Sequence, residues 1–254
     1  MRTSSGLTMV IDNGLPTGAF TDLITSHGEY IDLVKFGWGT ALVTRDLHRK
    51  ARVLAEAGIG FYFGGTLFEH HLWTGQLDED LDLVDRTGAT HIEVSNGTIP
   101  LDQHSKAEYV RRMSRYRPVL SEVGYKDAGR SAQLTPADWV DALRQDLDSG
   151  AFMVITEARE SGRSGIAQAD GHLRGDVFDA VIDSIDVDRV IFEAPTKDLQ
   201  VELITTLGPA VNLGNIATCD VIALETLRQG LRGDTLLALT TGADRTAQRF
   251  PSAA

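Results

Sequence analysis

The sequence predicts a single-domain α/β protein folded as a (β/α)8 TIM barrel. Short apolar runs rich in β-branched residues alternate with longer amphipathic runs along the chain, a pattern typical of parallel strands joined by right-handed helical crossovers. Eight such strand–helix units in 254 residues match the size and count of this barrel. A doubly wound open sheet is the rival, although no Gly-x-Gly-x-x-Gly motif follows an early strand.

The expected elements follow one another in regular order. Strands are expected at 8–12, 32–36, 60–63, 91–95, 119–123, 152–157, 189–193 and 210–213. Helices are expected at 17–27, 44–57, 77–87, 106–115, 136–149, 176–185, 199–206 and 221–231. Thr135 followed by Pro136 predicts a helix start, and Gly58 and Gly88 lie just past two helix ends. Because no linker divides the chain, we expect one domain over 1–254, with a loose C-terminal tail from about 235.

Composition and charge narrow the class of protein. The single cysteine, Cys219, excludes an internal disulfide framework and argues against a cysteine-based zinc site, so we expect a cytoplasmic location. The formal net charge of −12 argues against nucleic-acid binding. No apolar stretch approaches the length of a membrane span, so we expect no membrane association. An anionic ligand would need locally gathered cations or a metal.

Ionisable and amide side chains, mixed with glycines, follow the expected strands. The stretch 154–163 shows this most clearly, because it changes within a few residues from apolar to charged at Glu157, Arg159 and Arg163. In a barrel all these strand ends meet at one mouth, where glycines let the backbone approach a ligand. The other strand ends are Asp12-Asn13-Gly14, Lys35-Phe36-Gly37, Gly64-Gly65-Thr66, Glu93-Val94-Ser95-Asn96-Gly97, Glu122-Val123-Gly124-Tyr125-Lys126, Glu193-Ala194-Pro195-Thr196-Lys197 and Asn212-Leu213-Gly214-Asn215.

Five charged residues in or at the ends of strands carry the strongest functional signal. Lys35 lies inside a strand, where an unpaired ammonium is costly to bury, so it either reaches a ligand or pairs with a carboxylate such as Glu69 or Glu93. Glu93, Glu122, Glu157 and Glu193 each stand at a strand end. Ion pairing explains any one of these glutamates better than it explains all four, and Mg²⁺ prefers such oxygen ligands.

The other candidates have structural alternatives of equal weight. Lys126 lies on a polar loop, where an ordinary solvated lysine is as good an interpretation as a functional one. Lys197 and the segment 212–215 follow the seventh and eighth expected strands, the usual place of a phosphate site in this fold. A simple turn and a surface lysine explain them equally well.

Several motifs in chain order resemble the phosphosulfolactate synthase family, and the likeness runs from about Gly6 to Asp234. The motifs are Gly6-Leu7-Thr8-Met9-Val10-Ile11-Asp12, Val34-Lys35-Phe36-Gly37-Trp38-Gly39-Thr40, Gly64-Gly65-Thr66-Leu67-Phe68-Glu69, Glu122-Val123-Gly124, Glu157-Ala158-Arg159-Glu160-Ser161-Gly162, Ile191-Phe192-Glu193-Ala194-Pro195 and Leu224-Glu225-Thr226-Leu227-Arg228. Chance does not produce so many long motifs in one order.

The resemblance implies a barrel enzyme of the carbon–sulfur lyase class. Such an enzyme adds sulfite to phosphoenolpyruvate with Mg²⁺ and gives (2R)-phospho-3-sulfolactate, a step in sulfonate biosynthesis. Sulfite attacks the methylene carbon, and the negative charge that builds on the carboxylate requires Mg²⁺ and cations nearby. An acid then protonates the adjacent carbon, and Lys126 matches the lysine to which the family assigns this role. The family also implies a homo-oligomer.

The resemblance also implies a role for each candidate residue. The catalytic candidates are Lys126, Arg159 and Lys35. The metal-binding candidates are Glu122, Glu157 and Glu193. The substrate-binding candidates are Lys197, Asn212, Gly214, Asn215, Ser161, Asn96 and Tyr125. We expect the four cations Lys35, Lys126, Arg159 and Lys197 to meet around one rim.

Three positions depart from the family's pattern. Asn13, Asn96 and Tyr125 stand where the family has lysine, aspartate and lysine. Each lost charge-assisted hydrogen bond would cost roughly 1.5–3 kcal/mol of binding. One alternative is therefore the same phosphoenolpyruvate chemistry with a larger or neutral nucleophile in specialised metabolism. The other is a non-catalytic barrel that binds a phosphometabolite.

Overall fold

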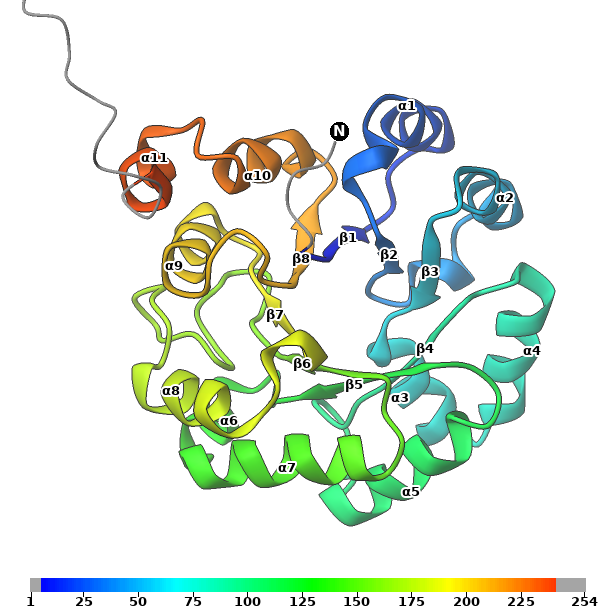
Figure 1. The fold of residues 1–254 in the computed structure, drawn as a ribbon. Helices are drawn as coiled ribbons and strands as arrows, with labels where there is room; N and C mark the ends of the chain where they lie inside the picture. Colours follow the sequence, from blue (N-terminus) through cyan, green and yellow to red (C-terminus); the bar gives the residue numbers. More distant parts are fainter. Residues whose placement is uncertain (1–5, 241–254) are drawn as a thin grey trace, which may run out of the picture.

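The computed structural model describes residues 6–240 and folds them into eight parallel strands that form a nearly closed barrel (Figure 1). The strands are β1 (Thr8–Asp12), β2 (Leu33–Phe36), β3 (Gly60–Phe63), β4 (Ile92–Val94), β5 (Val119–Val123), β6 (Met153–Thr156), β7 (Val190–Glu193) and β8 (Leu213–Ala217). They are hydrogen-bonded in the order β3-β2-β1-β8-β7-β6-β5-β4. The (β/α)8 barrel expected from the sequence is therefore confirmed.

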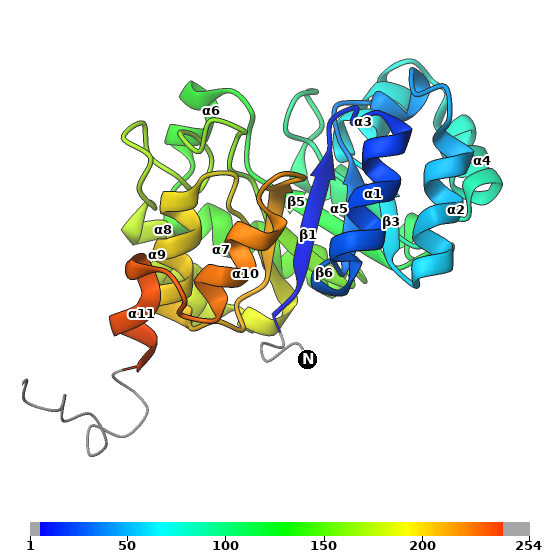
Figure 2. The same cartoon turned by 90° about the horizontal axis from the view of Figure 1, so that it is seen from above.

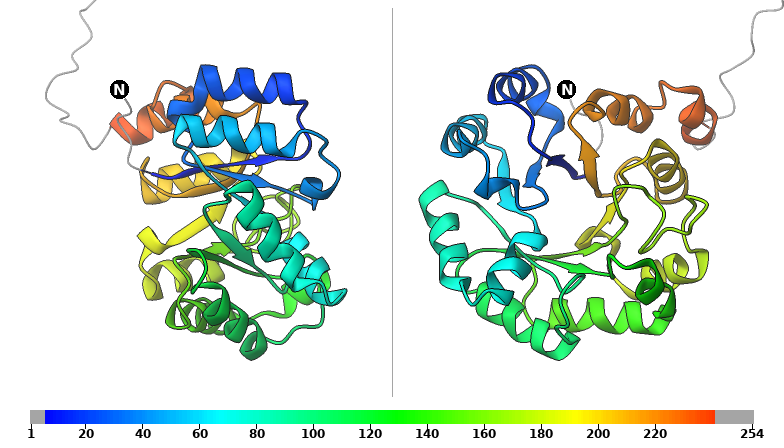
Figure 3. Two further views of the ribbon diagram at one scale, coloured as in Figure 1. Left: turned by 90° about the vertical axis from the view of Figure 1, so that its right-hand side faces the viewer. Right: turned by 180° about the vertical axis from the view of Figure 1, so that it is seen from behind.

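Helices surround the barrel on its outside, as Figure 1 and the two views of Figure 3 show. The α-helices are α1 (Thr17–His27), α2 (Leu47–Ala57), α3 (Gly65–Trp73), α4 (Leu77–Thr87), α5 (Gln103–Met113), α6 (Ala128–Gln133), α7 (Pro136–Asp148), α8 (Gly175–Ser184), α9 (Lys197–Leu207), α10 (Val221–Arg228) and α11 (Gly233–Thr240), and the 3-10 helices are η1 (Gly28–Tyr30), η2 (Thr40–Leu42) and η3 (Val187–Arg189). Figure 2 places α6 at the end of the barrel toward which β1 points. Within residues 6–240, no helix has the length and apolarity that crossing a membrane requires.

Strand alternation divides the apolar core into two parts. Residues that face outward, such as Val34 and Phe36, pack in a large cluster beneath the helices. The inward rows fill the lower barrel with Met9, Leu33, Tyr62, Leu120, Met153, Ile155 and Ile191. Because side chains on one face of a strand recur every second residue, the inward rows of β2, β5, β6 and β7 continue to Lys35, Glu122, Glu157 and Glu193. The same two-residue repeat that points apolar side chains into the lower barrel therefore also points these charged side chains toward the mouth.

The barrel has a seam between β3 and β4, for which the described residues show no strand pairing. At the amino end of this seam, the Thr90 N–H donates to the Phe61 carbonyl over 2.9 Å. At the carboxyl end, the Gly65 N–H donates to Oε1 of Glu93 over 2.5 Å. A Cβ at residue 65 would lie 2.6 Å from the same oxygen, so only glycine fits there. A glutamate of the mouth thus fastens the seam.

The position of β8 corrects the sequence prediction. The strand begins at Leu213, where the sequence analysis ends it. Gly214 and Asn215 interrupt the apolar run by which the other strands are recognised, so the pattern places the strand too early. Asn212 lies at the amino end of the barrel, where its side chain accepts the Leu7 N–H (3.0 Å) and donates to the Val190 carbonyl (3.1 Å). The segment 212–215 is therefore not a turn at the mouth.

Three of the α-helices were not expected from the sequence. Helix α3 follows β3 directly and is mostly buried, so it lacks the polar face of an amphipathic pattern. Helix α6 has 6 residues, too few to show helical periodicity. Helix α11 packs against α9 and α10 and occupies the start of the expected loose tail. That expectation is wrong up to residue 240, and the rest of the tail lies outside the described residues.

Candidate active site

A cavity of about 380 Å³ opens where the carboxyl ends of the strands meet. Its charged lining residues are Lys35, Lys126, Arg159, Glu122, Glu157, Glu160 and Glu193. Its other lining residues are Ile11, Asn13, Trp38, Gly64, Thr66, Pro195 and Asn215. The sequence predicted that the strand ends form one site, and the structure brings all three catalytic candidates and all three metal-binding candidates together in this cavity.

Lys35 is the cation at the centre of the cavity floor. Its Nζ lies 3.2 Å from a carboxylate oxygen of each of Glu93, Glu122 and Glu193. Burial alone would lower the pKa of Lys35, but the three carboxylates offset this effect and raise the pKa well above its ordinary value. Lys35 therefore stays protonated. It pairs with Glu93 but not with Glu69, and it also lines the cavity, so a role in ligand binding stays a prediction.

The four glutamates differ in how readily they ionise. Burial raises the pKa of Glu93 to about 7, although Lys35 opposes the shift. Burial raises the pKa of Glu157 well above its ordinary value, and Glu122 and Glu193 add to the effect. Burial also raises the pKa of Glu193. Burial acts on Glu122 in the same direction, but Lys35 and Lys126 outweigh it and lower the pKa of Glu122 to about 2.

Glu122, Glu157 and Glu193 have the geometry of a metal-binding group. One carboxylate oxygen from each lies within 4.8 Å of the others, and all three side chains are buried. Within residues 6–240, no nitrogen or hydroxyl donor lies within hydrogen-bond geometry of Oε1 of Glu122 or Oε2 of Glu157. The two carboxyl groups interact with each other, and a hydrogen bond with Glu157 helps to lower the pKa of Glu122. Buried carboxylate oxygens without donors are costly unless they ligate a cation. The donor set is all oxygen, which suits Mg²⁺ rather than a softer transition metal.

Lys126 and Arg159 lie on the wall of the cavity and are linked to each other. The Nζ of Lys126 donates to the Thr66 hydroxyl over 2.7 Å and lies 3.8 Å from Oε1 of Glu122. Burial lowers the pKa of Lys126, but Glu122 and Glu157 more than compensate and raise it. The guanidinium of Arg159 donates to the backbone carbonyl of Lys126 over 2.9 Å. The β5–α6 and β6–α8 loops are thereby tied together at the mouth.

A buried ion pair behind β5, which the sequence analysis missed, positions Glu122. The Nζ of Lys106 donates to Oδ2 of Asp146 over 2.7 Å and to the backbone carbonyl of Glu122 over 2.5 Å. Both side chains of the pair are fully buried. The available signal was Lys106 itself, because it shares a helix face with the apolar Val110 and Met113. A lysine on such a face requires a buried partner.

Several substrate-binding candidates do not line the cavity. Lys197 is the first residue of α9 and pairs with Asp234 of α11 over 3.0 Å, with 47% of its side chain exposed. It is therefore not part of the cationic rim expected from the sequence, because the unforeseen helix α11 supplies its partner. Ser161 is exposed on the β6–α8 loop. Gly214 packs inside the barrel, where an added Cβ would lie 2.6 Å from Cε of Met9.

Asn96 and Tyr125 line a different cavity, of about 280 Å³, beside α7. The Nδ2 of Asn96 donates to the Leu101 carbonyl over 3.0 Å, which secures its own loop. The ring of Tyr125 lies 3.9 Å from the guanidinium carbon of Arg130. Of the positions that depart from the family's pattern, only Asn13 lines the candidate active site.

The fold and the site together define a class, the (β/α)8 barrel enzymes whose active sites lie at the carboxyl ends of the strands. A family model described as ComA, (2R)-phospho-3-sulfolactate synthase, matches residues 2–234. The chain is 47% identical over 232 residues to a phosphosulfolactate synthase of Bacillus subtilis, covering 91% of this chain and 92% of that protein. It is 42% identical over 234 residues to the phosphosulfolactate synthase of Methanocaldococcus jannaschii, covering 91% and 93%. The chain belongs to the phosphosulfolactate synthase family.

Solved structures with little sequence identity share the fold. The truncated 3-deoxy-D-arabino-heptulosonate 7-phosphate synthase of Thermotoga maritima matches with a TM-score of 0.56 at 10% identity, covering 92% of this chain and 89% of that one. The phosphoenolpyruvate phosphomutase of Streptomyces platensis subsp. rosaceus matches with a TM-score of 0.53 at 11% identity, covering 96% and 88%. At such identities the likeness shows the barrel alone.

Proposed function

We propose that the protein is a phosphosulfolactate synthase that adds sulfite to phosphoenolpyruvate with Mg²⁺ and gives (2R)-phospho-3-sulfolactate. The observation that carries the proposal is the convergence of three cations with three buried glutamates in a single cavity. Membership of the family supports it, since the relatives are named for this synthesis.

The charge of the cavity supports a metal. Its lining includes three cations and four carboxylates, and a fifth carboxylate, that of Glu93, pairs with Lys35 without lining the cavity. Phosphoenolpyruvate and sulfite are both anions, and the carboxylates offset the charge of the three cations, so this lining alone offers the anions little net attraction. Mg²⁺ held by Glu122, Glu157 and Glu193 would reverse that balance and stabilise negative charge that develops on the substrate carboxylate.

In the proposed reaction, Lys126 acts as the general acid. Its ammonium is held by the Thr66 hydroxyl, and its raised pKa keeps the proton on Nζ at neutral pH. The sulfur lone pair of sulfite forms the C–S bond at the methylene carbon, and the π electrons of the double bond move toward the carboxylate. Transfer of the Nζ proton to the adjacent carbon completes the addition, and solvent then reprotonates Lys126. Arg159 and Lys35 bind the anionic groups meanwhile.

The placement of the departing residues favours sulfite over a larger nucleophile. Asn96 and Tyr125 lie outside the candidate active site, so their exchange for the family's residues leaves its charge unchanged. Asn13 alone removes a cation from the lining. The cavity therefore keeps most of the cationic set that two small anions require.

The test is an assay of purified protein with phosphoenolpyruvate, sulfite and Mg²⁺, followed by phosphorus NMR and mass spectrometry. A sulfonated phosphate ester that forms only when all three are present supports the proposal. Consumption of phosphoenolpyruvate only after addition of a cell extract indicates another nucleophile. Binding of phosphoenolpyruvate without turnover in either condition indicates a non-catalytic barrel.

The acid role of Lys126 predicts a loss of rate without a loss of fold. Lys126→Ala should lower kcat at least 100-fold, the lower limit usual for general acid catalysis, while circular dichroism and the unfolding midpoint stay close to wild type. Lys197→Ala is the matched control, because Lys197 lies outside the cavity. A Lys126→Ala enzyme that keeps near-normal kcat would refute the assignment.

A further inference from the structure

A second cavity has the β6–α8 loop as one of its walls. It has a volume of about 370 Å³ and is enclosed by α6, this loop and the start of α8. Its polar lining includes Ser131, Arg163, Ser164, Arg174 and Asp176. None of these residues takes part in the proposed reaction.

Two serine hydroxyls in this lining have no partner. Ser131 on α6 and Ser164 on the loop are 2% and 7% exposed. Within the described residues, neither Oγ makes a hydrogen bond. Leaving a buried hydroxyl unsatisfied is unfavourable, and here two from separate elements border the same cavity. A ligand with several acceptor oxygens would satisfy both at once.

The charge of the cavity is positive in a molecule of net charge −12. Its charged lining residues are Arg163, Arg174 and the single carboxylate Asp176, which lies 3.8 Å from Arg174. The guanidinium of Arg174 donates to the Ser131 and Leu134 carbonyls over 3.1 Å and 3.0 Å, and donors beyond these two remain. No ion pair of Arg163 occurs within residues 6–240. Arginine forks of this kind match phosphate and sulfonate oxygens.

The walls of the cavity are fixed to the candidate active site. Helix α6 begins two residues after Lys126, and Arg174 holds it against the loop. On the other wall, the Ile166 N–H donates to the Glu157 carbonyl over 2.8 Å. Gly165 makes this close approach possible, because its φ is +75° and a Cβ there would collide with the same carbonyl. A ligand in the cavity would therefore bridge the two loops that carry Lys126 and Arg159.

We infer that this cavity binds a tetrahedral oxyanion, either a free inorganic ion or the phosphate or sulfonate group of a small metabolite. Arg163 and Arg174 neutralise its charge, and the Ser131 and Ser164 hydroxyls donate to its oxygens. The site is separate from the candidate active site and does not depend on the reaction proposed above.

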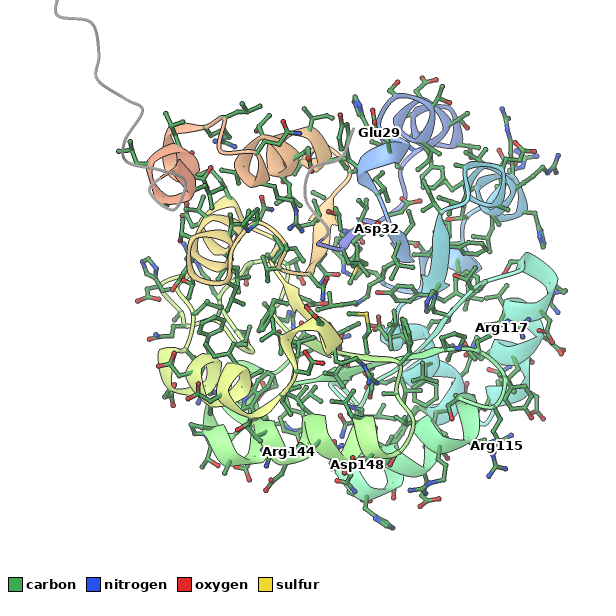
Figure 4. All side chains as sticks on the ribbon, viewed as in Figure 1. Glu29, Asp32, Arg115, Arg117, Arg144 and Asp148 are labelled. Carbon is green, nitrogen blue, oxygen red and sulfur yellow. The ribbon has the colours of Figure 1, made fainter. Side chains whose placement is uncertain are left out.

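The experiment measures thermal stabilisation and calorimetric binding of inorganic phosphate, inorganic sulfate and phosphoenolpyruvate to the full chain in EDTA. The variants are Arg163→Ala and Ser131→Ala, with Arg115→Ala as control, since Arg115 projects from the periphery of the molecule (Figure 4). We expect Arg163→Ala and Ser131→Ala to weaken binding about tenfold and Arg115→Ala to leave it unchanged. Ser131→Ala should also keep or raise the Tm without ligand, because it removes a hydroxyl that has no partner.

Each outcome decides the inference. If phosphate or sulfate stabilises the protein, and both variants weaken this effect, the site binds free ions. If only phosphoenolpyruvate stabilises it, and both variants weaken this effect, the site binds an esterified phosphate. Binding that both variants retain, or absence of binding by all three probes, overturns the inference. Because EDTA and the absence of sulfite prevent the proposed reaction, failure of that reaction leaves this result unaffected. Conversely, a Lys126→Ala enzyme that has lost turnover should still bind the ion here.

Discussion

Lys35 is the residue on which the balance of charge in the barrel depends. One ammonium, with 8% of its side chain exposed, lies 3.2 Å from each of three buried carboxylates. Desolvating such groups costs several kcal/mol each, so the arrangement is not explained as a source of stability. So costly an arrangement of charges at the mouth indicates a site that needs fixed charges. Removing the cation would leave the carboxylates without compensation.

Lys35→Met should therefore be strongly destabilising. We expect a loss of about 3–5 kcal/mol in the free energy of unfolding, as for other broken buried pairs, measured by urea denaturation at pH 7 without metal. Lys197→Met is the control, because its ion pair is half exposed and screened, and it should cost no more than about 1 kcal/mol. Equal losses for the two variants would contradict the account of Lys35.

Glu93 predicts how stability changes with pH. Its pKa is about 7 in the folded protein, above its ordinary value of 4.5. The Glu93 carboxyl therefore binds a proton more tightly in the folded state than in the unfolded state. The stability that this difference contributes is fully present below about pH 4.5 and is lost as the pH rises through 7. In EDTA, urea unfolding at pH 5 to 8 should show a shallower decline for Glu93→Gln than for wild type. Identical slopes would exclude the raised pKa.

At the scale of elements, the sequence predicts best where periodicity is clean. Strands β1, β3 and β5 and helices α1 and α4 begin and end where the pattern places them. Strand β8 does not, because glycine and asparagine in its middle hide it from any apolar pattern. Helix α3 was missed because burial on most sides removes the amphipathic signal.

The candidate site was predictable to the same extent. Strand ends alone bring Lys35, Glu122 and Glu157 to the mouth, because the inward rows of a parallel barrel share one direction. The bond between Lys126 and Thr66 was not predictable, since it joins a loop to a helix that has no sequence signature. Lys197 was misplaced because a local pattern cannot show which distant helix supplies its partner.

Gly124 predicts how tightly the ends of β5 and β6 are packed. Its φ is +126°, and a Cβ there would lie 2.7 Å from Cβ of Glu157 and 2.8 Å from the Trp139 ring. Gly124→Ala should lower the free energy of unfolding by roughly 2–4 kcal/mol through backbone strain and overpacking together, and it should displace Glu157.

Gly58→Ala is the matched control in chemical denaturation. Gly58 also has positive φ, at +69°, but an added Cβ would meet no atom within 4 Å. Gly58→Ala should lower the free energy of unfolding only by the cost of the left-handed backbone conformation, about 1 kcal/mol. A larger loss at Gly58 than at Gly124 would contradict the packing argument.

Over the whole molecule, an excess of negative charge surrounds a mouth that receives anions in the proposed reaction. The formal net charge is −12, and the cavity itself has more carboxylates than cations. Mutual repulsion of this kind lowers stability and slows the approach of anionic ligands. A divalent cation at Glu122, Glu157 and Glu193 would relieve both effects.

Magnesium should therefore stabilise the whole chain. At 100 times its Kd, a ligand specific to the folded state adds about 2.7 kcal/mol, which for a chain of this length raises the Tm by roughly 5–10 °C. Scanning calorimetry with MgCl2 against EDTA measures the shift. Glu157→Gln should abolish most of it, whereas Glu160→Gln, exposed on the adjacent loop, should preserve it. A shift that survives Glu157→Gln would place the ion elsewhere.

The seam between β3 and β4 ties architecture to chemistry. Glu93 closes this gap through the Gly65 amide with one oxygen and contacts Lys35 with the other. The barrel wall is thus closed by a carboxylate whose protonation state depends on the charged groups of the candidate active site. The seam and the site therefore cannot be redesigned separately. A variant in which Glu93 is replaced would also need another contact to close the gap between β3 and β4.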